Sequence, residues 1–185
     1  MACDLFSVGT SAECEEQFSG VGNYFLLVSH AALKSNVPAY DESKAKYTDD
    51  SFKDGTSPIK AVKVKIVADT GQVTATTNSG GGGFNNVFTA RVGKDMKKMS
   101  ALARRLNNMD DYYVLVPTGV TNEYYVVGDP NRAIVFDDNF DTGNTPDSEH
   151  GHTVTFTVNS TLYPGTTWTG AVDVVATEDS SASSD

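Results

Sequence analysis

The chain has 185 residues, 39% of them hydrophobic and 21% charged, which suits a single folded domain with a sizeable core. Its net charge of −10 argues against sequence-specific or broad nucleic-acid binding, because phosphate contacts need a basic surface. It has no apolar run near the roughly 20 residues that cross a bilayer, and its start lacks the features of a secretion signal. We therefore expect a protein that is made in a cytoplasm, is not exported and binds no membrane.

The two cysteines, Cys3 and Cys14, both lie near the start of the chain. A metal site would need further ligands, and no histidine is close to them in the sequence. A disulfide would require an oxidising compartment. Reduced thiols are the favoured interpretation, and the pairing of the two cysteines stays open.

The first predicted strand is the apolar run at 23–30, and the segment after it breaks the pattern. Residues 34–58 are polar and contain two prolines and five acidic residues. Unstructured segments of this length in compact domains are usually functional or disordered. Two interpretations remain: an arm that reaches a neighbouring subunit, or a mobile surface loop.

The sequence from 59 to 78 predicts a hairpin. Its first half alternates Val62, Val64 and Ile66 with lysines, which is typical of a half-buried strand. The turn is predicted at Asp69–Gly71, where glycine can adopt a positive φ. A glycine-rich break at 79–83 and a further strand over 84–92 follow.

One helix is predicted, over residues 95–108, with Asp95 as its N-terminal cap. Its apolar stripe consists of Met96, Met99, Leu102, Ala103 and Leu106. Basic residues gather on and beside it, off the stripe: Arg91, Lys94, Lys97, Lys98, Arg104 and Arg105. Such a group is either a solvated face or a surface that meets carboxylates of a neighbouring copy.

Two further hairpins are predicted, over 112–127 and over 132–164. The segment 166–185 then adds one strand and an acidic polar tail. Roughly seven to nine strands joined mainly as hairpins favour a mainly β fold, either an antiparallel β-sandwich or a small barrel with one packed helix. We expect one β domain over 1–165, with the loop or arm at 34–58.

Two Asp-Thr-Gly triplets, at Asp69 and Asp141, raise the possibility of a retroviral-type aspartic protease. Such an enzyme needs two carboxylates that share a proton in a desolvated cleft. Gln72 follows the first glycine where Ala or Ser is usual, and acidic residues precede Asp141. Both triplets are therefore interpreted as turns, and the protease is kept only as a remote alternative.

Two segments contain residues that could bind a metal ion. Asp137, Asn139 and Asp141 have the alternate spacing of a calcium loop, but the glycine and the far acid are displaced. His150 and His152 would share one face of a strand without an evident third ligand. We therefore expect no metal, no cofactor and no enzymatic activity.

Four stretches within residues 1–30 and 84–165 form a familiar series: the "MAC" start with Gly20 and Gly22, the "KDMKKMSALARRL" helix, the "YYVLV…EYYVVGD" hairpin and the closing "GHTVTFTV". On these stretches the chain resembles virion proteins from tailed phages of Bacteroidetes hosts. The order of these elements is similar to the tail-tube fold of long-tailed phages. This resemblance implies a many-copy structural subunit of a virion, forming rings around a lumen through which DNA slides. The alternative is an auxiliary or decoration protein of the phage head.

If copies assemble, the expected partners are the chain itself and other virion proteins. The predicted subunit contacts join the basic residues Lys94, Lys97, Lys98, Arg104 and Arg105 to an acidic tract of the next copy. The candidate tracts are Asp137, Asp138 and Asp141 in the last hairpin, or Asp49, Asp50 and Asp54 in the arm.

Overall fold

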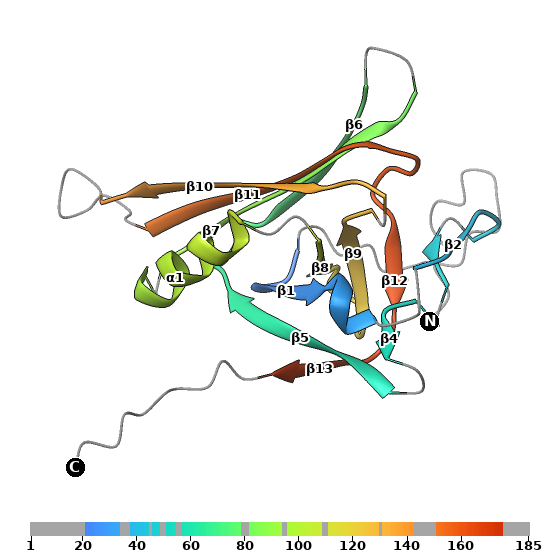
Figure 1. The fold of residues 1–185 in the computed structure, drawn as a ribbon, viewed down its shortest axis with the longest axis horizontal. Coiled ribbons are helices and arrows are strands. Elements are labelled where there is room, and N and C mark those ends of the chain that lie inside the picture. Colours follow the sequence, from blue (N-terminus) through green and yellow to red (C-terminus); the bar gives the residue numbers. More distant parts are fainter. Residues whose placement is uncertain are drawn as a thin grey trace, which may run out of the picture.

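A computed structural model describes residues 21–33, 38–44, 46–48, 51–54, 57–78, 82–93, 96–108, 111–129, 131–142 and 151–175. The fold is mainly β and has the form of a sandwich of two sheets that do not close into a barrel (Figure 1). The predicted fold class is therefore confirmed in its sandwich form, with one short α-helix.

The large sheet contains most of the strands. Its order is β13 (Val172–Val175), β5 (Ser57–Lys65), β1 (Tyr24–Ser29), β8 (Tyr112–Pro117), β9 (Glu123–Val127), β12 (Thr167–Thr169), β3 (Lys46–Tyr47) and β2 (Tyr40–Asp41), with β4 (Lys53–Asp54) beside the start of β5. Neighbouring strands are antiparallel, except that β13 pairs with β5 and β12 with β3 in parallel.

The small sheet has four antiparallel strands in the order β10 (Ile134–Asp141), β11 (Gly151–Thr161), β7 (Phe84–Val92) and β6 (Gln72–Thr77). It lies across one face of the large sheet, and β6 with its partner extends beyond the sandwich (Figure 1). The helix α1 (Met96–Leu106) packs beneath one end of the small sheet, and a short 3-10 helix η1 (His30–Leu33) follows β1.

The strand and helix phases predict one buried cluster of seven residues, and the core between the two sheets contains four of them, with the other three at its margin. Ile66, Leu106, Val154 and Phe156 are buried there, and Val62, Val64 and Leu102 pack against them partly buried. The ring of Phe25 from the large sheet makes edge contacts at 5.4 Å with Phe88 and Phe156 of the small sheet. The prediction of one shared cluster is confirmed, but the burial predicted for Val62, Val64 and Leu102 is only partial.

A second core covers the opposite face of the large sheet, and the segment predicted as a mobile arm or loop supplies part of it. Phe52 is fully buried and Tyr47 nearly so, and the Phe52 ring contacts Tyr113 and Trp168 at centroid distances of 5.0 and 5.3 Å. The described part of 34–58 is therefore not a loose surface loop, and its contact with a neighbouring subunit stays a prediction. Isolated aromatic residues anchor this polar segment, and composition alone does not reveal such anchors.

The hairpin predicted over 59–78 is also wrong, although both of its strands form. Lys65 at the end of β5 pairs with Tyr24 of β1, whereas Gln72 at the start of β6 pairs with Thr89 of β7. The segment between them is a corner that crosses from one sheet to the other. The turn itself is confirmed, but Asp69 rather than Gly71 has the positive φ, of 60°.

Gly71 is needed at this corner for space rather than for φ. A Cβ there would lie 2.3 Å from Val21 Cγ2 and 2.8 Å from Ile66 Cδ1. The two sheets can therefore meet closely at the corner because residue 71 has no side chain.

The remaining elements agree with the sequence patterns. β8 pairs with β9 and β10 with β11 as the two predicted hairpins, and the helix occupies most of its predicted range. The C-terminal segment supplies two strands, β12 and β13, where one was predicted, and Trp168 of β12 is fully buried. Cys3, Cys14 and Asp95 lie outside the described residues. Within the described part of the chain, no helix has the length and apolar character to cross a membrane.

Candidate functional site

The outer face of the small sheet carries mostly uncharged polar side chains. Because side chains alternate along a strand, those between the buried positions point away from the core. These outward residues are Gln72, Thr74 and Thr76 of β6, Asn85, Val87, Thr89 and Arg91 of β7, Thr153, Thr155 and Thr157 of β11, and Val135, Asp137, Asn139 and Asp141 of β10. Thr89 and Thr155 oppose each other, with their hydroxyl oxygens 3.4 Å apart.

Both outer strands of the small sheet have an edge that no strand of the described chain pairs with. β10 pairs only with β11, and β6 pairs only with β7. Each edge therefore presents backbone N–H and C=O groups on its free side. Val135 is an exposed apolar residue on the outward face of β10, at one of these edges.

The predicted subunit contacts divide between places in the fold. Arg104 and Arg105 are exposed on α1 and, with Ala101 and Asn108, line a shallow open hollow. Lys94 lies outside the described residues, as do Asp49 and Asp50, and the side chains of Lys97, Lys98 and Asp54 are not described. Asp137 and Asp141 are exposed on β10.

Asp138 differs from its acidic neighbours because its carboxylate faces inward. Both of its oxygens lie 2.9 Å from His152 Nδ1. Its side chain is only 18% exposed, although the residue as a whole, backbone included, is exposed. Asp138 is therefore held inside the subunit, whereas the prediction placed it at a contact between subunits.

His152 links this carboxylate to the helix. Its Nε2 lies 3.3 Å from Ser100 Oγ on α1, and the residue is only 3% exposed. The exposed ring of Phe140 lies over the imidazole at a centroid distance of 4.8 Å. The fold thus brings together a histidine and an aspartate from one hairpin and a serine from the helix α1.

Part of this arrangement was readable in the sequence. His152 is in phase with Val154 and Phe156, and Asp138 is in phase with Ile134 and Phe136, so strand alternation places both inward. The register that sets them beside each other depends on the hairpin turn, which the sequence does not fix. Ser100 was missed because the helix packing that delivers it has no local signal.

The opposite end of the small sheet adjoins an acidic corner at β2. Asn86 Nδ2 donates hydrogen bonds of 3.0 Å to Thr161 Oγ1 and to the Tyr163 carbonyl. The Tyr163 ring stacks on Tyr40 at 3.5 Å, and its hydroxyl donates to Glu42 at 3.2 Å. Partial burial, followed by the negative charge of Glu42, raises the pKa of Tyr163.

Neither the protease pair nor the calcium loop is assembled. Asp69 lies at the corner beside β7 and Asp141 at the end of β10, and β11 runs between those strands. Asp137, Asn139 and Asp141 follow one another along an extended strand rather than curling around a common point. The described residues contain no group of three or more His, Cys, Asp or Glu side chains that could hold a metal.

Comparison of the chain with models of protein families, with curated proteins and with solved structures gave no match.

Proposed function

We propose that this chain is a structural subunit that assembles with copies of itself into rings, as a tail-tube-type component of a phage virion. The observation that carries the assembly is the small sheet, with two free edges and one open polar face. The virion context rests on the sequence resemblance alone.

The strand directions favour closure into a ring. The two edge strands, β10 and β6, run in opposite directions because three antiparallel steps separate them. If copies rotate about an axis roughly parallel to these strands, β6 of one copy meets β10 of the next in antiparallel orientation. The same pairing then repeats around the ring, and a head-to-tail interface of this kind closes without leaving an edge exposed.

The open face suits the inside of such a ring. Its described side chains are mainly threonine, asparagine and glutamine, and the charged ones are Arg91, Asp137 and Asp141. Without a basic cluster, such a face would not hold the phosphates of a passing nucleic acid. This chemistry fits a lumen through which DNA slides.

When rings stack, arginines at one end of the subunit would face the carboxylates of Asp41 and Glu42 at the other, where Asp41 also pairs with Lys44 at 3.5 Å. The helix α1, which carries Arg104 and Arg105, follows β7 at its Val92 end. The other end of β7, at Phe84, is eight residues away and pairs with Thr161 beside the acidic corner. Eight strand residues span roughly 26 Å, and Figure 1 shows α1 and β2 at opposite ends of the molecule. Asp41 and Glu42 of one copy can thus approach the arginines of the next, whereas Asp137 and Asp141 lie toward the same end as α1.

Electron microscopy of the purified chain tests the assembly, with edge variants to locate the interface. Thr74→Lys with Thr76→Lys adds two charges to the edge strand β6, and lysine on an edge strand opposes pairing with another chain. The matched control is Thr155→Lys with Thr157→Lys, which adds the same charge to the same face within the interior strand β11.

We expect rings or tubes from the unchanged chain and from the interior control, and single subunits from the edge variant. Equal loss in both variants would implicate charge repulsion rather than edge pairing. Single subunits from the unchanged chain at all concentrations would overturn the proposed ring and would favour the auxiliary capsid role.

A further inference from the structure

We propose that Ser100 is an activated nucleophile, with His152 as its base and Asp138 as the positioning residue, and that it accepts an acyl group from activated esters. This inference does not depend on ring assembly. It rests on a serine, an imidazole and a carboxylate in one line of hydrogen bonds.

The geometry matches what an activated serine needs. A base must lie within hydrogen-bond reach of the hydroxyl, although such bonds are often somewhat long without a substrate, and a third group must orient the base. Ser100 Oγ to His152 Nε2 is 3.3 Å, and His152 Nδ1 to both Asp138 oxygens is 2.9 Å. With Nδ1–H donating to Asp138, Nε2 is left as the acceptor that faces the serine.

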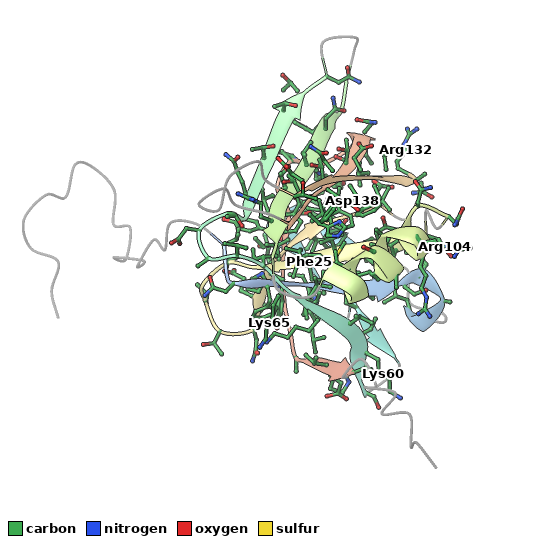
Figure 2. The ribbon with its side chains drawn as sticks, turned by 90° about the vertical axis from the view of Figure 1, so that its left-hand side faces the viewer. Phe25, Lys60, Lys65, Arg104, Arg132 and Asp138 are labelled. Atoms are coloured by element: carbon green, nitrogen blue, oxygen red, sulfur yellow. The ribbon has the colours of Figure 1, made fainter. Side chains whose placement is uncertain are left out.

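The histidine is buried and the serine is exposed, as acyl transfer from a dissolved ester requires. His152 is nearly inaccessible, and Phe140 covers its ring, which fixes the imidazole in one orientation. Ser100, by contrast, lies at an exposed position of α1, where an ester in solution can reach it. Figure 2 shows Asp138 on the small sheet beside α1 and Arg104 on the helix itself.

Arg104 offers a charge for the reacting group. It follows Ser100 by four residues on the helix, so the two side chains share a face. Its guanidinium is exposed beside the hollow that Ala101 helps to line. A cation on the same helix face favours acyl donors that carry negative charge or develop it on the carbonyl oxygen.

The step balances without any further reagent. Ser100 Oγ attacks the carbonyl carbon while its proton passes to His152 Nε2, and the carbon–oxygen bond to the alcohol then breaks. The departing alkoxide takes the proton from Nε2, which leaves an ester on Ser100 and a neutral histidine. Water that follows the same path would release the acid and restore the serine.

Labelling of the full chain with a fluorophosphonate, followed by peptide mass spectrometry, tests the proposal. Ser43 serves as an internal control: it is an exposed serine whose hydroxyl donates to the Asp41 carboxylate at 2.6 Å, and no described histidine contacts it. We expect the label on Ser100, at least tenfold above that on Ser43, and none at position 100 in Ser100→Ala.

Two variants separate activation from a merely structural bond. Asp138→Asn preserves the size of the side chain but can hold the imidazole in the wrong tautomer, so labelling of Ser100 should fall at least tenfold while the circular dichroism spectrum is unchanged. Asp138→Glu keeps the carboxylate and should retain more labelling than the asparagine variant. Equal labelling of Ser100 and Ser43 in the unchanged chain, or full labelling in folded Asp138→Asn, would overturn the proposal.

Discussion

Replacement of Phe52 by alanine tests whether the segment at 38–54 is a fixed part of the fold. Phe52 is fully buried and makes edge contacts with Tyr47, Tyr113 and Trp168 at 5.5, 5.0 and 5.3 Å. Removal of a buried phenylalanine ring typically costs about 3–5 kcal/mol, and aromatic pairs of this geometry add to the loss. A mobile arm would lose less than about 0.5 kcal/mol, as exposed substitutions do.

The backbone at Phe52 sharpens the test, because its φ of 56° is unfavourable for any residue with a Cβ. Such a conformation costs about 1–2 kcal/mol for ordinary L-residues, and glycine avoids this cost. Phe52→Gly should therefore be no less stable than Phe52→Ala. At Phe25, which is equally buried in β1, glycine should be less stable than alanine by about 0.5–1 kcal/mol.

Urea unfolding provides the measurement. Trp168 is the single tryptophan of the chain and is fully buried beside Phe52, so its fluorescence reports loss of this core, and circular dichroism reports loss of the sheets. A free-energy change below 1 kcal/mol for Phe52→Ala would refute the anchored segment. The same order of alanine and glycine at positions 52 and 25 would refute the backbone argument.

Three further outcomes are expected. Gly71→Ala should lower the free energy of unfolding in urea by about 1–3 kcal/mol, because a Cβ there is crowded by neighbouring side chains. Gly82→Ala should cost less, since φ is unfavourable there but no atom lies within 4 Å of the added Cβ. Equal costs for the two variants would contradict this explanation. Burial, and then the negative charge of Asp129, raises the pKa of Tyr47 from 10.0 to about 12. The folded state therefore holds the tyrosine proton more tightly than the unfolded state does. The contribution of this proton to the free energy of unfolding is full below pH 10 and is lost as the pH rises toward 12. Alkaline unfolding should therefore be shallower in Tyr47→Phe, and an unchanged slope would count against this. The double substitution Arg104→Glu with Arg105→Glu should slow the stacking of rings at low salt, as followed by light scattering. Adding Asp41→Lys and Glu42→Lys should restore the rate. An unchanged rate in the arginine variant would mean that this helix face is only solvated.

The sequence predicted the identity of strands better than their partners. The alternation at 59–66 and 72–77 is the same whether the two strands form a hairpin or belong to separate sheets. Their partners decide the outcome: Val62 and Val64 sit opposite β1, and Val73 sits opposite Phe88 of β7. Such pairing is set by tertiary contacts, because it depends on residues that are far away in the chain.

The segment at 34–58 shows a second limit. Its composition is polar throughout, and its two-residue strands are too short to establish any periodicity. What fixes it is Phe52 and Tyr47, single aromatic residues among charged neighbours. One large ring can bury enough apolar area to hold a short polar segment. A prediction from hydrophobic periodicity does not detect such a ring, because it depends on several apolar residues at regular spacing.

The alternation of apolar and polar residues differs between the strands of the two sheets, and this difference bears on function more than any motif does. β8 is buried at all six positions, and its residues "YYVLVP" show no alternation, because the large sheet has a core on each face. β7 alternates from Asn86 to Val92 and β11 from His152 to Val158, with every second residue buried there, because the small sheet has a core on one face only. The central strands β1 and β8 of the large sheet are therefore covered on both faces, while the small sheet keeps an open face and two open edges. An assembly of copies would use the sheet that the fold leaves open, and the alternation of threonine with valine and phenylalanine at 153–158 already marks that sheet in the sequence.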